Sequence, residues 1–336
     1  MAIAAKTAEL DPATAVPAAK GKSARKSNYI PLRIRFKAWW EGVSIETLMR
    51  RQRKAAARKA KVTIDIDKNL AETEATLTDF ELLMSIREEV WGKDQVVPGD
   101  PEYAVDFLKA AKLKPGVVVL DLAAGLGGFN RSVAVALDAL VEGMETDESI
   151  AKMGAGRAAR VALDKQAPIA HYVAHNPYLK VDRYDCVYAH EAFHKILDKK
   201  YLLTEIWKSL KEEGHLIFSD LIYPDPEAEN AKDVRAWISS EPETPDPWRK
   251  DEYEEALGEL GFKIHAFKDD TERYQAVIKE AWANFADTLD EKKIDRRFVD
   301  VMMYEAKRWQ CRMQAIKDGH LRFVQVHAVR PKASIR

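Results

Sequence analysis

The stretch that decides the fold is Val117-Val118-Val119-Leu120-Asp121-Leu122-Ala123-Ala124-Gly125-Leu126-Gly127-Gly128-Phe129. An apolar run that ends in an acid is typical of a strand buried on both faces. The glycines predict a sharp turn whose backbone a ligand can approach closely. A helical run at 130–140 follows, so its free N–H groups and positive dipole end would face that ligand.

The spacing of this turn argues against two common phosphate-binding motifs. The dinucleotide pattern has its glycines directly after the strand, and the P-loop requires Gly-Lys-Ser/Thr. The pattern here is Asp121-x-x-x-Gly125-x-Gly127-Gly128, which has neither feature. A carboxylate beside the turn would repel a pyrophosphate, so the turn favours a cationic ligand.

Strands and helices alternate after this turn, which predicts an α/β fold with a doubly wound, Rossmann-like sheet. Seven segments have strand character: residues 117–120, 139–144, 169–174, 184–188, 215–220, 262–267 and 321–329. We expect a domain at 113–336, with insertions on the substrate side at about 222–250 and 271–318. A helical cap is expected at 62–112, where Thr78-Asp79-Phe80-Glu81 matches a capping box.

The first 61 residues are expected to form a basic, partly disordered arm. They carry 15 Lys and Arg against four acidic residues, although the formal net charge of the whole chain is −1. Residues 1 to about 28 have the composition of a disordered segment. Residues 29–61 have apolar residues at roughly helical spacing, which suits a helix packed on the domain or one lying on an anionic membrane. No nucleic-acid-binding module is visible, so no nucleic-acid partner is expected.

The composition is that of an ordinary soluble globular protein. The chain has 336 residues, of which 46% are hydrophobic and 32% charged. No apolar run is long enough to span a bilayer, and acids and prolines interrupt residues 1–20, which make a poor signal peptide. The two cysteines, Cys186 and Cys311, do not indicate a disulfide scaffold. The expected location is the cytoplasm. The alternative is peripheral contact with the inner face of the membrane through residues 29–61.

The glycine turn resembles motif I of the class I S-adenosylmethionine-dependent methyltransferases. The resemblance implies S-adenosyl-L-methionine as cofactor and S-adenosyl-L-homocysteine as product. Asp121 would hold the cofactor's ammonium group, Glu145 the ribose hydroxyls and Asn176 the adenine amino group. Asp147 competes with Glu145 but also looks like a helix N-cap. The cofactor-binding residues implied are Asp121, Ala123, Gly125, Gly127, Gly128, Glu145, Thr146, Asn176 and His190.

Three further segments resemble the small-molecule methyltransferases related to phosphoethanolamine and sarcosine/dimethylglycine N-methyltransferases. They are Tyr184 to Lys199, Leu210 to Asp220, and the loop Trp91-Gly92 to Pro98-Gly99. The chain departs from the phosphoethanolamine enzymes at Lys195, where that group has a catalytic histidine, and it lacks a tyrosine before Trp91.

A different function class is suggested by His190-Glu191-Ala192-Phe193-His194, which matches His-Glu-x-x-His. On a helix, two histidines four residues apart can bind zinc, with the glutamate as general base. The segment directly follows a buried strand, however, and no clear third ligand stands out. No metal is therefore expected, and a zinc metallopeptidase is kept as a remote alternative.

In the methyltransferase interpretation this segment lies at the strand ends, where open α/β sheets bind ligands. The candidate catalytic residues are His190, Glu191 and His194. A histidine would take the proton from an amine or hydroxyl acceptor, whereas a thioether needs no base. Aromatic side chains that would wall the acceptor pocket are Tyr178, Tyr223, Trp237, Trp248 and Tyr274.

The expected partner is a small-molecule acceptor, methylated on an amine nitrogen or a thioether sulfur. A lipid or lipid head group at the membrane surface is the alternative. The sequence is also compatible with a homodimer.

Overall fold

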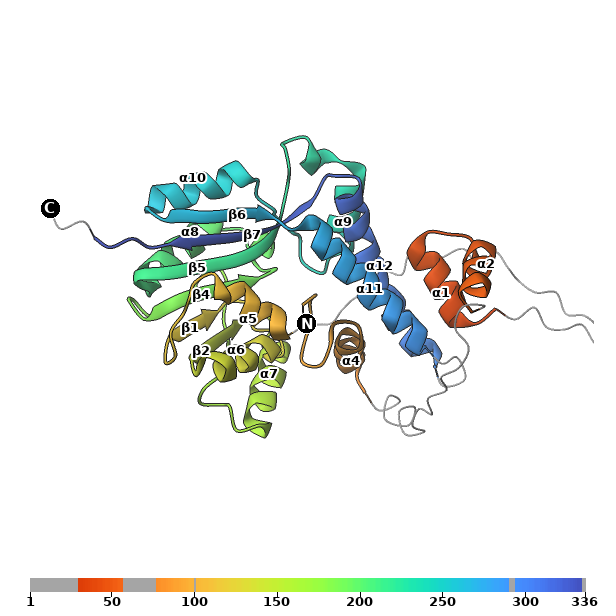
Figure 1. Ribbon diagram of the computed structural model, residues 1–336, viewed down its shortest axis with the longest axis horizontal. Coiled ribbons are helices and arrows are strands. Elements are labelled where there is room, and N and C mark those ends of the chain that lie inside the picture. The colour runs from red at the N-terminus through yellow and green to blue at the C-terminus, as the bar shows by residue number, and fades with distance from the viewer. Residues whose placement is uncertain (1–29, 57–76, 100, 290–293, 334–336) are drawn as a thin grey trace, which may run out of the picture.

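A seven-stranded mixed sheet forms the centre of the computed structural model, which describes residues 30–56, 77–99, 101–289 and 294–333 (Figure 1). The strands are β1 (Val118–Asp121), β2 (Leu140–Glu145), β3 (Ile169–His171), β4 (Tyr184–His190), β5 (Leu210–Ile222), β6 (Lys263–Asp269) and β7 (Arg322–Val329). Their order is β3-β2-β1-β4-β5-β7-β6, and β7 runs antiparallel to both of its neighbours. The predicted seven-stranded, doubly wound fold is confirmed.

Alternate residues of the central strands face two separate cores. Val119 packs with α5 (Pro101–Lys109) and α6 (Gly128–Leu137), whereas Leu120 packs with α8 (Lys199–Ser209) and α10 (Lys250–Leu260). The chain moves from β1 to β3, with α7 (Glu148–Arg160) as the second crossover, and then returns to place β4 beside β1. Because parallel crossovers are right-handed, this reversal puts α8 on the opposite face from α6. The carboxyl ends of β1 and β4 therefore form a topological switch point, where such sheets bind ligands.

Four helices form a cap beyond the carboxyl ends of the strands (Figure 1). They are α4 (Asp79–Trp91), α9 (Lys232–Ser240), α11 (Thr271–Thr288) and α12 (Arg296–Lys317). Their shared core includes Trp237, Trp282 and Trp309, which are at most 1% exposed. The segment expected as a loop at 222–250 thus contains a helix, α9, as well as the short 3-10 turn η2 (Ala228–Asn230).

The described part of the basic arm forms two helices, α1 (Leu32–Glu41) and α2 (Ile45–Ala56). Phe36 is 2% exposed and packs against Trp282 and Phe285 of α11, and Lys37 pairs with Asp287. The apolar face of α1 is therefore covered by the protein itself, as the packed-helix alternative requires. Contact with a membrane stays a prediction, and residues 1–29 and 57–61 lie outside the described residues. No helix in the described ranges has the length and apolarity to cross a bilayer.

The residues expected to cap the starts of two helices do so in the structure. The predicted capping box is present, because Thr78 Oγ1 accepts from the N–H of Glu81 and the Glu81 carboxylate accepts from the N–H of Thr78. Asp147 is the N-cap of α7, where it accepts from the N–H groups of Ser149 and Ile150. Some strand ends differ from the expected ones: β3 ends at His171 rather than at residue 174, β4 extends to His190, and β5 begins at Leu210 rather than at residue 215.

Two glycines allow a test of the turn after β1. Gly127 has φ +79°, and an added Cβ would lie 2.4 Å from Ile169 Cδ1, whereas a Cβ on Gly156 in α7 would meet nothing within 4 Å. We predict that Gly127→Ala lowers the free energy of unfolding by about 3 kcal/mol through backbone strain and overpacking. The control, Gly156→Ala, should raise it by about 0.5–1 kcal/mol. Urea denaturation of both variants measures this, and equal effects would contradict the described turn.

Candidate active site

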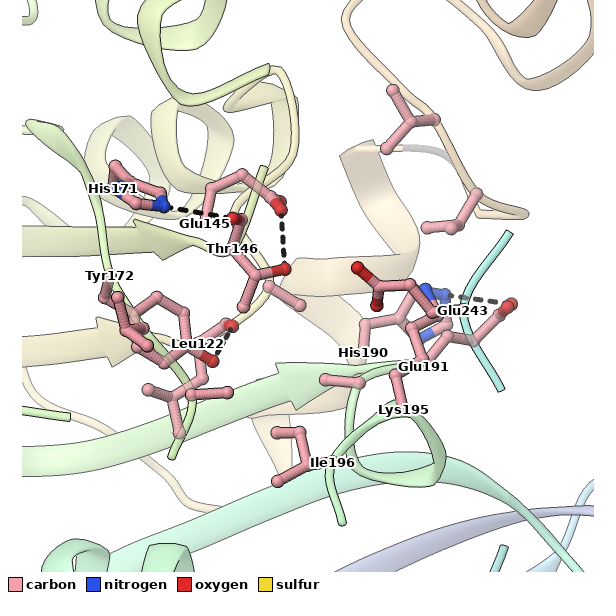
Figure 2. Close-up of a pocket in the computed structure, with 16 residues that line it drawn as sticks. Leu122, Glu145, Thr146, His171, Tyr172, His190, Glu191, Lys195, Ile196 and Glu243 are labelled. Carbon is pink, nitrogen blue, oxygen red and sulfur yellow. Dashed lines mark hydrogen bonds and ion pairs between the residues drawn. The ribbon is translucent and has the colours of Figure 1, made fainter. Parts of the chain in front are cut away.

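A cavity of about 310 Å³ lies at the carboxyl ends of β1, β2 and β4, on the switch point. Figure 2 shows that its polar side chains gather at two ends: Glu145, Thr146 and His171 at one, and His190, Glu191, Lys195 and Glu243 at the other. Val96 and Val97, from the loop between α4 and α5, complete the lining. The cavity is therefore elongated and polar at both ends.

Glu145 is the central polar group of the first end. Its carboxylate accepts hydrogen bonds from the backbone N–H groups of Gly125, at 2.9 Å, and Asp147, at 3.0 Å, and from the Thr146 hydroxyl, at 3.3 Å. These donors fix the carboxylate at the end of β2 and leave lone pairs free for ligand hydroxyls. The predicted acid of the second strand thus lines the cavity.

Asp121 lies beneath the cavity floor rather than in it. It is 2% exposed, and its carboxylate accepts from the N–H of Ala123 at 2.9 Å. Burial raises the pKa of Asp121 to about 7, the hydrogen bond from Ala123 opposes this, and the nearby Glu145 carboxylate adds to it. Asp121 therefore closes the turn, while Ala123 lines the cavity.

The three glycines of the turn make room for protein as well as for a ligand. They do not line the cavity. An added Cβ would lie 2.9 Å from Val96 at Gly125 and 2.3 Å from Gln95 at Gly128. From the sequence, these glycines are explained by close approach of a ligand to the backbone. That explanation is incomplete, because the loop between α4 and α5 packs on the same turn.

Part of the cavity wall is apolar and forms a slot beside Tyr172. It is lined by Leu122, Tyr172, Ala174 and Ile196, and the Tyr172 hydroxyl donates to the carbonyl of Leu122 at 3.1 Å. Asn176, expected here, is exposed and does not line the cavity. The cause is the early end of β3, since a turn closed by the Asn176 N–H and the Val173 carbonyl carries Asn176 away.

His190 is held from both ring nitrogens at the second end of the cavity. Nε2 lies 2.7 Å from the Pro98 carbonyl, and Nδ1 lies 2.5 Å from Ser219 Oγ. A carbonyl can only accept, so Nε2 donates to Pro98 and Nδ1 accepts from the Ser219 hydroxyl. Burial lowers the pKa of His190, with Glu191 opposing this, so the ring is neutral at pH 7. His190 thereby ties the α4–α5 loop to the sheet.

Glu191 is buried and strained. Its φ is +52°, a region that non-glycine residues rarely occupy, and its side chain is almost wholly buried. Arg312 of α12 donates to Oε2 at 2.8 Å, whereas Oε1 has no hydrogen-bond partner among the described residues. Strain of this kind is found at functional sites, and a buried oxygen without a donor indicates a place for a ligand group.

Two oppositely charged side chains, Lys195 and Glu243, complete the second end of the cavity. Both are exposed to the cavity and its mouth, and within the described residues no ion pair or hydrogen bond joins Lys195 to an acid. With His190 neutral, the charged lining is Glu145, Glu191 and Glu243 against Lys195. The cavity is therefore net negative, which favours a cationic ligand.

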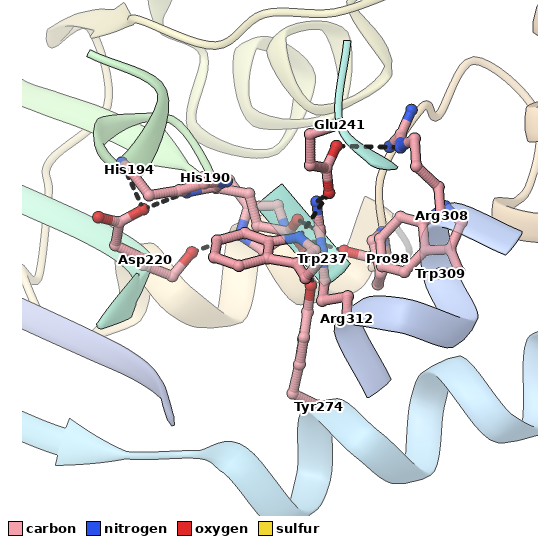
Figure 3. A network of polar contacts seen from close by, with 12 residues as sticks. Pro98, His190, His194, Asp220, Trp237, Glu241, Tyr274, Arg308, Trp309 and Arg312 are labelled. Carbon is pink, nitrogen blue, oxygen red and sulfur yellow. Dashed lines mark hydrogen bonds and ion pairs between the residues drawn. The ribbon is translucent and has the colours of Figure 1, made fainter. Parts of the chain in front are cut away.

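His194 does not line the cavity, in contrast to its predicted catalytic position. It lies in the 3-10 turn η1 (Phe193–Lys195), where Nδ1 donates to Asp220 Oδ1 at 2.6 Å (Figure 3). The Tyr253 hydroxyl donates to the other oxygen of Asp220 at 2.7 Å. Burial lowers the pKa of His194, which keeps the ring neutral. We assign it to anchoring the turn after β4.

The geometry rejects the His-Glu-x-x-His interpretation. His190 ends β4 and His194 belongs to η1, so the two rings do not share one face of a helix. Each ring is bound to different partners, and the described residues contain no group of three or more potential ligands placed to hold a metal ion.

The aromatic residues expected around the acceptor lie elsewhere. None of the five lines the cavity. Trp237, Tyr223 and Tyr274 belong to the core under the cap, Trp248 packs beside Tyr253, and Tyr178 is 88% exposed. For Tyr223 and Trp237 the reason is that α9 packs on α12, so their large apolar surfaces are buried in the core of the cap.

Several lining residues escaped the sequence interpretation. Lys195 was visible only as a departure from a motif, and Glu243 lies in a proline-rich segment that carries no signal for a site. Val96 and Val97 belong to the loop that sequence reasoning noted only as a motif match.

The lining fits S-adenosylmethionine. The carboxylate of Glu145 can accept ribose hydroxyls, the slot beside Tyr172 suits an adenine ring, and the net negative lining suits a sulfonium. The unpaired Glu191 Oε1 lies at the opposite end. One cavity can therefore hold this cofactor at the first end and a second molecule at the other.

Comparison with known proteins agrees with this fit. Residues 99–266 match the family model described as a methyltransferase domain. The chain is 26% identical over 222 residues to phosphoethanolamine N-methyltransferase 1 of Arabidopsis thaliana, covering 66% of this chain and 39% of that protein.

Two solved structures share the fold. Phosphoethanolamine N-methyltransferase 2 of Haemonchus contortus, in complex with S-adenosyl-L-methionine, has a TM-score of 0.65 at 19% identity, covering 82% of this chain and 62% of that one. A candidate sarcosine dimethylglycine methyltransferase from Galdieria sulphuraria has a TM-score of 0.58 at 14% identity, covering 69% and 85%. With the sheet order and the site, the family match shows that the chain belongs to the class I S-adenosylmethionine-dependent methyltransferases.

Proposed function

We propose that the chain transfers a methyl group from S-adenosylmethionine to the amine nitrogen of a small dipolar acceptor. The observation that carries this is the charge pattern of one cavity: a net negative lining with the single cation Lys195 at the acceptor end. The Arabidopsis relative is named for phosphoethanolamine, which has an amine and an anionic group. The chain covers 39% of that relative, so its activity is not carried over as a whole.

The first end of the cavity would hold the cofactor, which supplies an electrophilic methyl on a sulfonium. Glu145 would accept the ribose hydroxyls, with Thr146 and Asp147 fixing its carboxylate. Asp121 would stabilise the positive end of the cofactor from below the turn. These groups orient and stabilise rather than react, so positioning and electrostatics would supply most of the rate.

The second end would hold the acceptor. Glu191 and Glu243 suit a cationic nitrogen, and Lys195 suits an anionic group on the same molecule. A thioether has neither charge nor N–H, so these carboxylates would have nothing to bind. This favours the amine over the thioether.

An ammonium acceptor must lose a proton before it can attack the methyl group. Both ring nitrogens of His190 are occupied, so it would have to release the Ser219 hydroxyl before accepting a proton. Glu191 Oε1 has no hydrogen-bond partner among the described residues, so it can accept a proton without breaking a contact. We therefore assign proton acceptance to Glu191 and the placement of the α4–α5 loop to His190.

A lipid head group is the second candidate acceptor. The observation that favours it is the set of exposed arginines on α1 and α2: Arg33, Arg35, Arg50 and Arg51. Such a surface would attract anionic lipids.

The function is tested by following labelled methyl transfer from S-adenosylmethionine with metal-free protein. We predict product with phosphoethanolamine, sarcosine or dimethylglycine, and none with a thioether that lacks an amine, such as dimethyl sulfide. Vesicles containing phosphatidylethanolamine form a second arm, and transfer only there would favour the lipid candidate. Absence of transfer to every amine would contradict the proposal.

Lys195→Met tests the anionic half of the acceptor. Because the variant loses the cation that would pair with a phosphate or carboxylate, we predict a KM for the dipolar acceptor raised at least about 10-fold. The matched control is Lys200→Met, an exposed lysine on α8 that pairs with the exposed Glu259. Unchanged KM in Lys195→Met, measured by initial rates, would remove Lys195 from the acceptor site.

Asp121→Asn tests the buried acid. Since the pKa of Asp121 in the folded protein, about 7, exceeds the unfolded value of about 4, the stability gained from the protonated form is full below about pH 4 and is lost as the pH rises through 7. Asparagine mimics the protonated form and lacks this loss. We predict that the unfolding free energy of the wild type falls relative to Asp121→Asn between pH 5 and pH 8, by roughly 3 kcal/mol at most. Parallel pH profiles would show that Asp121 has an ordinary pKa.

A further inference from the structure

We infer that Arg312 is a positioning residue for the acceptor site: it holds the Glu191 carboxylate so that Oε1 is presented to the cationic nitrogen of the acceptor. This rests on the proposed function and adds a residue that does not line the cavity. Arg312 belongs to α12, whereas Glu191 follows β4. The cap would therefore set the orientation of Glu191 through this contact.

Arg312 is fixed by groups from three parts of the cap (Figure 3). It is 2% exposed, and it donates to Glu241 Oε1 at 2.6 Å and to the Tyr274 hydroxyl at 3.1 Å. Its guanidinium lies 4.4 Å from the ring centroid of Trp309. A guanidinium held on both sides and over its face has little freedom, so its bond to Glu191 has a defined direction.

The bond from Arg312 uses one carboxylate oxygen of Glu191 and leaves the other. Nη1 donates to Oε2 at 2.8 Å, while Oε1 has no partner among the described residues. Glu191 is further held by its N–H, which donates to the Ser219 carbonyl at 3.0 Å. A buried carboxylate oxygen without a donor is costly, and an acceptor N–H would satisfy it.

A second arginine of the same helix provides a matched control. Arg308 is 8% exposed and forms ion pairs with Glu241 and Glu305, but it forms no hydrogen bond or ion pair with Glu191. Replacing it disturbs the same buried network and helix without touching the acceptor residue. A purely structural role of Arg312 would therefore give the two arginines similar effects on turnover.

The experiment compares R312Q, E191Q, the double variant and R308Q. With phosphoethanolamine as acceptor, we expect kcat/KM to fall about 100-fold in R312Q and in E191Q, the size typical of breaking a buried charge pair. The double variant should be no worse than E191Q, because Arg312 acts through Glu191. In these variants the affinity for S-adenosylhomocysteine should stay within about 3-fold of the wild-type value. R308Q should have a lower Tm than the wild type, but its turnover should stay within a few-fold of the wild-type turnover.

Two results would overturn the inference: equal loss of turnover in R308Q and R312Q, or additive losses in the double variant. Should R312Q not fold, R312K keeps the charge but cannot reach Glu191 and Glu241 together, and an unchanged KM in R312K would also overturn it. Absence of transfer by the wild type contradicts the proposed function instead. Normal transfer by both the wild type and R312Q contradicts this inference alone.

Discussion

A network of buried charges within the cap, joined to the sheet through the pair Arg312–Glu191, is the constraint on which the rest of the structure depends. Arg312 bonds Glu191 and Glu241, and Arg308 bonds Glu241 and Glu305. An unpaired charge in such a place would cost several kcal/mol, so the cap must sit where every partner is met. Burial opposes ionisation of Glu241, but the two arginines outweigh it and hold its pKa well below the usual range. Packing of the tryptophan-rich core and pairing of the buried charges therefore favour the same position of the cap on the sheet.

That arrangement explains why one cavity has two chemically different ends. The sheet alone provides Glu145 and the apolar slot beside Tyr172, which any ligand with a ribose and a flat ring could use. The other end needs the cap, because α12 orients Glu191 and the α9–α10 segment brings Glu243. A sheet that binds a cofactor is common to many reactions, so specificity for an acceptor would reside in the parts that the cap adds.

The sequence was informative where the determinants are local. The apolar runs of the buried strands, the glycine turn at Gly127 and the cap at Thr78 are set by a few adjacent residues, so the sheet and the place of Glu145 beside the cavity could be predicted. The bond between Glu191 and Arg312 joins residues 121 positions apart, and no local pattern marks it. Trp237 was misplaced because aromatic rings suit a ligand wall and a core equally well, and only the fold of α9 decides between them.

The most direct test of this account is calorimetric titration of metal-free protein with S-adenosylhomocysteine, for the wild type and Glu145→Ala. The account predicts one site per chain in the wild type and clearly weaker binding in the variant, because the ribose hydroxyls would lose their acceptor. Equal binding by both proteins would place the cofactor away from β2. No binding by the wild type would contradict the assignment of the cavity altogether.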